Sequence, residues 1–463
     1  MVPERLRPVL DVAIELAQLF ESAGTRLYLV GGAVRDALLD QLNAGSDLDF
    51  TTDALPTRTE QILSSWADTM WTQGKRFGTI GAAKGGRRVE VTTHRAEEYS
   101  AGSRKPEVEF ASAIQADLSR RDFTVNAMAL SLPDLQLVDP FNGVADLAAK
   151  RLRTPLPADL SFTDDPLRML RAARFIAGYG LQPVPDLLEA VTRLRGRLDI
   201  VSDERVRDEL DKLLVVPDPS DGLWFLVSTG LAEEFLPELP ALALEQDPVH
   251  RHKDVLAHTI AVVQRARPSR TVRLAALFHD IGKPKTRSFG PGGTVSFHHH
   301  ELVGARMTRD RMRALRYPAE DIERVSRLVE LHLRFHTYAM GWTDSAVRRY
   351  VRDAGDLLDD LNELTRADCT TRNPARARAL SQRMDELERR IAELRESEEL
   401  AAIRPDLDGR EVMSHLGLSP GPIVGRALAY LLEMRLDEGP HSQEEATRLL
   451  DDWWARQPEA GRG

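Results

Sequence analysis

The sequence predicts an α+β multi-domain protein, with an N-terminal α/β region built on a mixed sheet and a mostly α-helical remainder. The chain has 463 residues, which is too many for one ordinary hydrophobic core. Its first 150 residues contain strand-like runs separated by turn residues, namely LYLV, DLDFTT and RFGTIGAAKGGRRVEVTT. From about residue 160 the apolar residues recur instead at helical spacing.

Composition and charge favour a soluble, cytoplasmic protein. No segment approaches the roughly 18 uninterrupted apolar residues that a membrane span needs, so we expect no membrane contact. Glu4, Asp11 and Glu15 interrupt the apolar pattern of the N-terminus, which predicts an amphipathic helix and not a signal peptide. The single cysteine, Cys369, cannot form an internal disulfide, which agrees with a reducing compartment. The net charge of -10 hides local arginine clusters that could bind RNA.

The first candidate site is the pair of aspartates in SDLDF. Strand side chains alternate between the two faces of a sheet, so Asp47 and Asp49 project together while Leu48 and Phe50 face the other side. Two carboxylates about 4 Å apart repel by roughly 1 kcal/mol in water and by more when desolvated. A divalent cation reverses this repulsion, and oxygen ligands beside a phosphate favour Mg²⁺. Taken alone, such a pair is more often a surface turn or cap.

The neighbouring segments make a nucleotide site the better interpretation. LYLVGGAVRD predicts a strand, a turn at Gly31 and Gly32 where backbone can approach a ligand, and a helix that contains Arg35. Small residues at such a turn expose N–H groups that suit a triphosphate, although the spacing is neither a Walker loop nor a dinucleotide fingerprint. Glu90, on a following strand, could add a third carboxylate; an ion pair with a neighbouring arginine is the alternative.

The segment DDPLRMLRAARF predicts a helix that could read a base. Pro166 suits the first turn, Asp165 lies at or near the N-cap, and Arg168, Arg171 and Arg174 follow at three-residue steps. A carboxylate beside a guanidinium complements the Watson–Crick edges of cytosine and adenine, whereas uracil and guanine present a carbonyl in place of the amino group. The alternative is a helix cap with surface salt bridges.

Five motifs in this order resemble the head and neck of the class II tRNA nucleotidyltransferases, which include the CCA-adding enzymes and bacterial poly(A) polymerases. The motifs are LVGGAVRD, SDLDF, RRDFTVNAMAL, GVAD and DDPLRMLRAARF, and SDERVRDELDKLL matches the family's last neck motif. The resemblance covers roughly residues 25–215. Gly143 and Asp146 fall in the family's hinge motif. The family usually has Glu where this chain has Asp164, one methylene shorter.

This resemblance implies a two-metal nucleotidyltransferase. Asp47 and Asp49 would be catalytic and would hold Mg²⁺ for in-line phosphoryl transfer. Glu90 is the third candidate catalytic carboxylate, from its position on the neighbouring strand. The glycines and Arg35 would contact the triphosphate, the RRDF residues the sugar, and the last two arginines of the helix motif the phosphates. The residues implied to bind the nucleotide are Gly31, Gly32, Arg35, Arg121, Asp122, Asp165, Arg168, Arg171 and Arg174.

Two segments favour CCA addition over poly(A) addition. HRAEEYSAGSRKPEVEF resembles the loop that family members use to switch from C to A addition. The C-terminal segment, QEEATRLLDDWWARQPEAGRG, is acidic on balance, whereas poly(A) polymerases of this family usually carry basic extensions. We therefore expect tRNA, CTP and ATP as partners, and no DNA. Poly(A) addition is the alternative.

A second constellation lies farther along the chain, where histidines gather beside carboxylates in VLAHTI, LFHDIGKP, FHHHELVGA, VELHLRFH and TRADC. It resembles the HD-superfamily phosphohydrolases, whose ligands follow the order His, His-Asp, Asp. The resemblance implies a site for Mn, Ni, Fe or Zn and a 2′,3′-cyclic phosphodiesterase, 2′-nucleotidase or phosphatase activity. The implied ligands are His258, His279, Asp280 and Asp368, with His300 and His332 as candidate ligands of a second metal. Hydrogen-bonded core residues are the alternative, which we keep for His298, His299 and His336.

We expect four domains from these features. They are a nucleotidyltransferase head at 1–155, a helical neck at 156–248, an HD domain at 249–375 and a helical, tRNA-binding body and tail at 376–463. A rival interpretation makes the HD domain the working nucleotide phosphohydrolase, with a head that only binds RNA.

Overall fold

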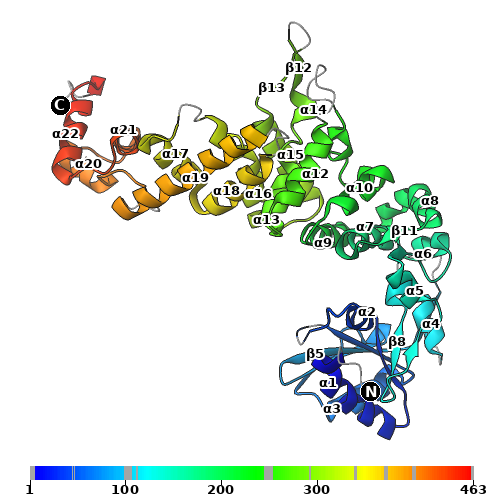
Figure 1. Ribbon diagram of the computed structural model, residues 1–463. Coiled ribbons are helices and arrows are strands. Elements are labelled where there is room, and N and C mark those ends of the chain that lie inside the picture. The colour runs from blue at the N-terminus through cyan, green and yellow to red at the C-terminus, as the bar shows by residue number, and fades with distance from the viewer. Residues whose placement is uncertain are drawn as a thin grey trace. The chain divides into compact units, whose positions relative to one another are not determined.

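The computed structural model divides the chain into two compact units, Met1–Pro237 and Glu238–Gly463, which we describe separately (Figure 1). None of the helices in the described part of the chain is long and apolar enough to cross a bilayer. The residues that the structure describes are 6–43, 45, 47–98, 107–110, 113–244, 254–290, 294–337, 341–369, 374–398 and 403–459.

The first unit is built on a seven-stranded sheet in the order β3-β4-β5-β2-β1-β8-β9 (Figure 1). Strands β2 and β5 pair in parallel, and every other neighbouring pair is antiparallel. The predicted mixed sheet is therefore confirmed. The strands are β1 (Leu27–Val30), β2 (Leu48–Thr52), β3 (Thr69–Trp71), β4 (Thr79–Lys84), β5 (Arg87–Thr93), β8 (Ala129–Leu132) and β9 (Leu137–Val138).

The core of this unit lies between the sheet and helices α1 (Arg7–Ser22), α2 (Gly32–Leu38) and α3 (Pro56–Ser64). Strand β2 shows the expected alternation, since Leu48 and Phe50 are buried while Asp49 between them is exposed. Each fully buried apolar side chain of this size contributes about 1.5–3 kcal/mol. The burial of its two neighbours therefore fixes the face on which Asp49 projects.

Strands β6 (Arg95–Glu98) and β7 (Glu107–Phe110) form a separate antiparallel pair that follows β5. They flank residues 99–106, which lie outside the described residues, so the segment that resembles the C-to-A switching loop is described only at its two ends. The two ends of this segment therefore pair with each other outside the main sheet, between β5 and α4.

Helices dominate the rest of the first unit, as predicted. Helix α7 packs against α6, α9 and α10. A Cβ atom at Gly222 of α10 would lie 2.6 Å from the carbonyl oxygen of Ala173 in α7, so glycine is needed for this close approach. The elements are α4 (Ile114–Ser119), α5 (Gly143–Ala148), β10 (Arg151–Leu152), α6 (Ala158–Asp164), α7 (Leu167–Tyr179), β11 (Gln182–Pro183), α8 (Pro185–Leu194), α9 (Asp203–Leu214), α10 (Ser220–Ser228) and α11 (Leu231–Phe235).

The second unit is helical apart from one hairpin, β12 (Arg287–Phe289) and β13 (Val295–Phe297), in the described part of the chain. Helix α13 packs against α12, α16 and α18, and α20 to α22 share a small core of their own. The helices are α12 (Val255–Arg265), α13 (Arg270–Phe278), α14 (Lys283–Thr286), α15 (His300–Ala314), α16 (Ala319–Leu331), α17 (Asp344–Ala354), α18 (Leu358–Asp368), α19 (Pro374–Ser397), α20 (Gly409–Leu416), α21 (Pro422–Glu438) and α22 (Gln443–Trp454).

Candidate functional site

A pocket of about 270 Å³ in the first unit collects residues from the sheet, from the RRDF segment and from α7. Its lining joins sequence motifs that are more than 100 residues apart, which the fold brings together at one place. The lining residues are Gly31, Gly32, Asp49, Arg121, Asp122, Asn126, Asp165, Leu167, Arg168, Arg171 and Arg205.

Three carboxylates lie near one another where β2 begins beside the middle of β5. The parallel register sets Asp49 directly beside Glu90, and neighbouring strands lie about 4.8 Å apart. Asp47 immediately precedes β2. Although the side chain of Asp49 is open to the pocket, the protein around its carboxyl desolvates it and raises its pKa. The charge of Arg121 opposes this rise, and that of Asp47 reinforces it. Burial, Asp49 and Asp47 likewise raise the pKa of Glu90. This donor set of mutually repelling oxygens fits a hard divalent cation.

The glycine turn brings a guanidinium close to these carboxylates. Gly31 has a φ of 70°, and a Cβ atom at this position would lie 2.9 Å from the Nη1 atom of Arg121. Arg121 is held from its other side by Asp117, at 3.3 Å. The turn therefore needs glycine for its backbone conformation, and a side chain here would also displace the end of Arg121.

Arg35 does not line the pocket. Its guanidinium instead contacts other residues of the protein. It is buried, and its Nη1 donates a hydrogen bond to the side-chain oxygen of Asn126. Its guanidinium carbon lies 4.2 Å from the ring centroid of Tyr179, at the end of α7. The predicted contact between Arg35 and a triphosphate stays a prediction.

Asp122 ties the sheet region to α7. Its carboxylate accepts hydrogen bonds from Arg171 Nε at 2.8 Å, from Asn126 at 3.0 Å and from the N–H of Phe123 at 2.8 Å. Burial alone would raise the pKa of this carboxyl, but the charge of Arg171 and these hydrogen bonds lower it to about 2. Asp122 is therefore ionised and held in place at neutral pH.

The remaining arginine of the helix motif points elsewhere. Arg174 Nε lies 2.9 Å from Glu209 Oε2 on α9, and Arg174 does not line the pocket. Arg171 lies between Asp122 and the same Glu209, 3.7 Å from the latter. Arg171 lines the pocket and Arg174 does not, and the expected contact of both arginines with the phosphates stays a prediction.

Asp165 and Arg168 both line the pocket, and each is held by its own partners. Asp165 directly precedes Pro166, the N-cap of α7, and so lies near the N-cap as predicted. Its Oδ1 accepts a hydrogen bond at 3.3 Å from the N–H of Leu167, and its other oxygen lies 3.4 Å from Arg205. Arg168 is buried, and its Nη1 donates to the hydroxyl of Ser161 at 2.8 Å. The two groups that would read a base are thus positioned before any nucleotide arrives.

Sequence reasoning assigned no role to Asn126, Arg205 or Glu209. Asn126 lies in RRDFTVNAMAL, and the other two lie in SDERVRDELDKLL. Arg205 and Glu209 are four residues apart on α9 and so share one face of that helix, which is the signal that could have identified them.

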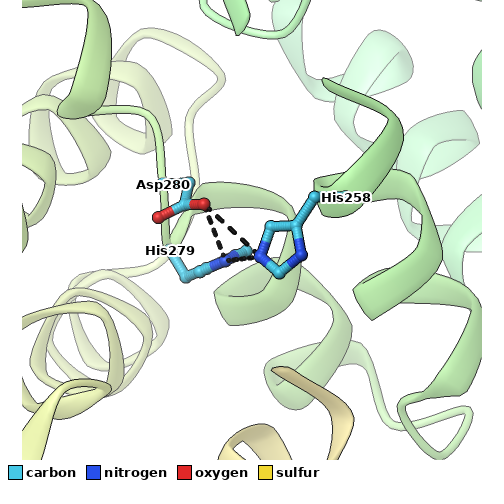
Figure 2. Close-up of side chains that lie close together, drawn as sticks. All are labelled: His258, His279 and Asp280. Atoms are coloured by element: carbon cyan, nitrogen blue, oxygen red, sulfur yellow. Dashed lines mark hydrogen bonds and ion pairs between the residues drawn. The ribbon is translucent and has the colours of Figure 1, made fainter. Parts of the chain in front are cut away.

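The second unit brings the predicted HD residues together (Figure 2). His258 comes from α12, His279 and Asp280 directly follow α13, and Asp368 ends α18. His258 Nε2 lies 3.2 Å from His279 Nε2, 3.5 Å from Asp280 and 3.0 Å from Asp368. Imidazole nitrogens and carboxylate oxygens at such spacing could bind one transition metal.

His300 and His332 form a second group with Asp280. Nδ1 of His300 hydrogen-bonds the carbonyl of Phe297 at 2.8 Å, and that of His332 bonds the carbonyl of Val329 at 2.6 Å. A carbonyl only accepts, so Nδ1 carries the proton, and in the neutral imidazole Nε2 is left with a lone pair. Both Nε2 atoms are buried and make no hydrogen bond within the described part of the chain, and Nε2 of His300 lies 3.4 Å from Asp280 Oδ1. Buried acceptors without a donor fit metal ligation.

The protonation states differ within this cluster. Burial and the charge of His279 lower the pKa of His332 to about 3, so its imidazole is neutral. Burial opposes the ionisation of Asp280, but the charges of His279 and Lys283 hold its pKa well below the usual range. Burial lowers the pKa of His279, but the carboxylates of Asp280 and Asp368 outweigh burial and raise it. A metal binds neutral imidazole and ionised carboxylate, so metal binding would release the proton that His279 carries when charged. His298, His299 and His336 are exposed, so the prediction that they are hydrogen-bonded core residues was wrong.

Three family models match the sequence. They are "Poly A polymerase head domain" over residues 27–153, "Probable RNA and SrmB- binding site of polymerase A" over residues 180–242, and "HD domain" over residues 255–394.

Several characterised proteins are similar over most or about half of the chain. An A-adding tRNA nucleotidyltransferase of Deinococcus radiodurans is 35% identical over 93% of this chain and 96% of that protein. A CC-adding tRNA nucleotidyltransferase of Thermus thermophilus is 33% identical over 92% of this chain and 93% of that protein. A CCA-adding enzyme of Streptococcus pneumoniae is 37% identical over 52% of this chain and 58% of that protein.

Solved structures share the fold. The CCA-adding enzyme of Bacillus stearothermophilus in complex with CTP has a TM-score of 0.70, with 23% identity over 98% of both chains. The Thermotoga maritima CCA-adding enzyme complexed with tRNA has a TM-score of 0.59, with 19% identity over 96% of this chain and 95% of that chain. The predicted fold class, an α/β region with a mixed sheet followed by a helical remainder, is confirmed.

Replacing Asp122 by Asn tests the link between the sheet region and α7. A native pKa of about 2, below the unfolded value near 3.8, stabilises the folded state above about pH 4, and this stabilisation is lost as the pH falls towards 2. We expect Asp122→Asn to lower the free energy of opening at α7 by roughly 2 kcal/mol at pH 7 and by less near pH 3. Amide hydrogen exchange of α7 measures it. Asp159→Asn, in an exposed ion pair, serves as control and should change little. Equal protection in wild type and Asp122→Asn would contradict the link.

Replacing Asp280 by Asn tests metal binding by the second unit. Asp280 belongs to both ligand groups, and loss of even an outer partner of a metal site costs 10–100-fold in affinity, so we expect at least about a tenfold fall in metal retention. Metal content after loading with Mn²⁺, Ni²⁺ or Zn²⁺ and desalting gives the readout. The exposed His299→Ala is the matched control. Metal retained equally by Asp280→Asn would rule out these ligands.

Proposed function

The chain belongs to the family of tRNA nucleotidyltransferases and poly(A) polymerases, and from this premise we propose that it adds CCA to tRNA 3′ ends from CTP and ATP without a template. One observation carries the proposal: a single pocket is lined by the Gly31–Gly32 turn, by Asp49 from the carboxylate cluster, and by Asp165 and Arg168 of the base-reading motif. A pocket lined both by a phosphate-binding turn with a carboxylate and by a base-reading pair can hold the phosphates and the base of one nucleotide.

We assign phosphoryl transfer to the cluster of three carboxylates on and beside strands β2 and β5. Asp47, Asp49 and Glu90 would hold Mg²⁺, as their repelling oxygens favour. When bound, the ions supply Lewis acidity for in-line displacement at the α-phosphorus. Arg121, held beside the glycine turn by Asp117, would pair with the triphosphate, and Asp122 would position the sugar through Asn126 and Arg171.

We assign base selection to Asp165 and Arg168. The carboxylate would accept from the amino group of cytosine or adenine, and the guanidinium would donate to the adjacent ring nitrogen. UTP and GTP would set a carbonyl against Asp165 and leave a desolvated acceptor without a donor, which costs about 1–3 kcal/mol. Since both side chains are already anchored, by Leu167 and by Ser161, little reordering is needed on binding.

Complete CCA addition is the form we propose, although the two relatives similar over nearly the whole chain carry names of partial activities, A-adding and CC-adding. The segment between β5 and α4 supports this choice. It is long enough to leave the main sheet as its own strand pair, and its sequence resembles the loop that switches from C to A addition.

A second activity is favoured by the two buried Nε2 atoms of His300 and His332. We propose a metal-dependent phosphohydrolase, acting as a 2′,3′-cyclic phosphodiesterase or phosphatase on RNA ends. When bound, the metal supplies Lewis acidity for hydrolysis of a phosphate ester. The residues proposed to hold Mn, Ni, Fe or Zn are His258, His279, Asp280 and Asp368, with His300 and His332 for a second ion.

We assign tRNA binding to the C-terminal body and tail, within the four-domain division of head 1–155, neck 156–248, HD domain 249–375 and tail 376–463. Helices α20 to α22 fold around their own core and so offer a stable platform. Half-buried rings of Tyr430, Trp453 and Trp454 follow one another at 6.1 and 6.4 Å on it. Such rings suit stacking on unpaired bases.

Incubation with tRNAs of different length tests the proposed reaction. tRNA lacking all three terminal nucleotides, given CTP and ATP, should gain three and stop. A CC-only enzyme stops after two, an A-only enzyme extends only tRNA that ends in CC, and a poly(A) polymerase does not stop. Asp49→Ala should abolish every addition yet leave the phosphohydrolase intact; the exposed Asp134→Ala is its control. Additions that survive in Asp49→Ala would overturn the assignment.

Replacing Asp165 by Asn tests base selection. The amide can present N–H to the carbonyl of uracil, so the preference for CTP over UTP in kcat/KM should fall about tenfold or more. Single-nucleotide incorporation with each triphosphate measures this ratio. Asp159→Asn, on the neighbouring helix α6, should keep the wild-type ratio. An unchanged ratio in Asp165→Asn would show that another group reads the base.

A further inference from the structure

The hairpin β12–β13 lies between two proposed metal ligands. It connects α14 to α15, so it follows Asp280 closely and ends just before His300. In Figure 1 its strands extend beyond these helices. Across the hairpin, Arg287 pairs with Phe297 and Phe289 with Val295. Nδ1 of His300 bonds the carbonyl of Phe297, which ties the hairpin to the cluster.

The charge of this segment differs from that of the chain. Asp and Glu make up 72 of the 463 residues, yet none occurs between Asp280 and Glu301. The same stretch contains Lys283, Lys285 and Arg287, followed by three histidines. A basic stretch in an acidic protein favours a phosphate-bearing partner.

Aromatic rings and cations alternate along the hairpin towards the metal cluster. Phe289 is 68% exposed, the largest value for any large apolar side chain in the described residues. The guanidinium of Arg287 lies 4.9 Å from its ring centroid. Phe297, the cross-strand partner of Arg287, lies 5.6 Å from Lys283 Nζ. Lys283 in turn contacts Asp280 at 2.7 Å.

We propose that this hairpin binds the single-stranded 3′ end of RNA and directs its terminal phosphate to the cluster of Asp280. Phe289 stacks on a base, and Lys285 and Arg287 contact the phosphates that follow. Stacking surfaces interleaved with cations are how proteins hold single strands without reading their sequence. The fate of the bound end rests on the proposed phosphohydrolase function; the binding itself does not.

Binding is tested with the full chain in EDTA, without nucleoside triphosphates, by fluorescence anisotropy of a five-nucleotide RNA that ends in a 3′-phosphate. Phe289→Ala loses one stacking ring and should bind this RNA about tenfold more weakly than the wild type does. Phe289→Tyr keeps an aromatic ring and should bind it with the wild-type affinity. Lys285→Gln should reduce the slope of log affinity against log salt by about 0.7. Leu302→Ala, an exposed apolar residue on α15, is the matched control.

A photoreactive 4-thiouridine at the 3′-terminal nucleotide then locates the bound end. We expect crosslinks to peptides that cover residues 283–299. The proposal would be overturned if Phe289→Ala bound the RNA with wild-type affinity, or if the crosslinks were confined to the first unit. The exposed ring of Phe289 would then be better explained as part of a protein-binding surface. Hydrolysis of the bound end is measured separately in the wild type and in His258→Ala, which lacks a proposed metal ligand. If the wild type binds the RNA but does not hydrolyse it, only the proposed phosphohydrolase function is refuted.

Discussion

The parallel register of β2 and β5 is the constraint on which the nucleotide site depends. It sets Asp49 beside Glu90, with Asp47 one step before the strand, and burial of Leu48 and Phe50 leaves Asp49 no other face. Desolvation raises the pKa of Asp49 and of Glu90, and the charge of Asp47 adds to both rises. The fold keeps this unfavourable arrangement of like charges, which is the reason for our proposal that a cation binds there.

Two sites with different donor chemistry coexist in the chain, each within its own compact unit. The first offers carboxylate oxygens and guanidinium groups, which suit Mg²⁺ and a triphosphate. The second offers imidazole nitrogens and carboxylate oxygens, which suit a transition metal. An enzyme that builds RNA ends would gain from a second site that clears terminal phosphates before a nucleotide is added.

Local pattern predicted much of this, and long-range pairing explains the rest. Alternation in SDLDF gave the face of Asp49, and Asp165 before Pro166 gave the start of α7. No local signal shows that Arg174 pairs with Glu209 or that Arg35 stacks on Tyr179, because these contacts join segments that only packing brings together. Histidine spacing likewise suggested the ligands, but not that Nε2 of His300 and His332 would be buried without a donor.

The most direct measurement is anomalous diffraction from crystals of the protein soaked with Mn²⁺ and a non-hydrolysable CTP analogue. We predict a manganese peak between the carboxylates of Asp47 and Asp49, in contact with the phosphates of the analogue, whose base lies against Asp165 and Arg168. Density in which the two aspartates point apart, with no metal between them and the analogue bound elsewhere, would contradict the central claim.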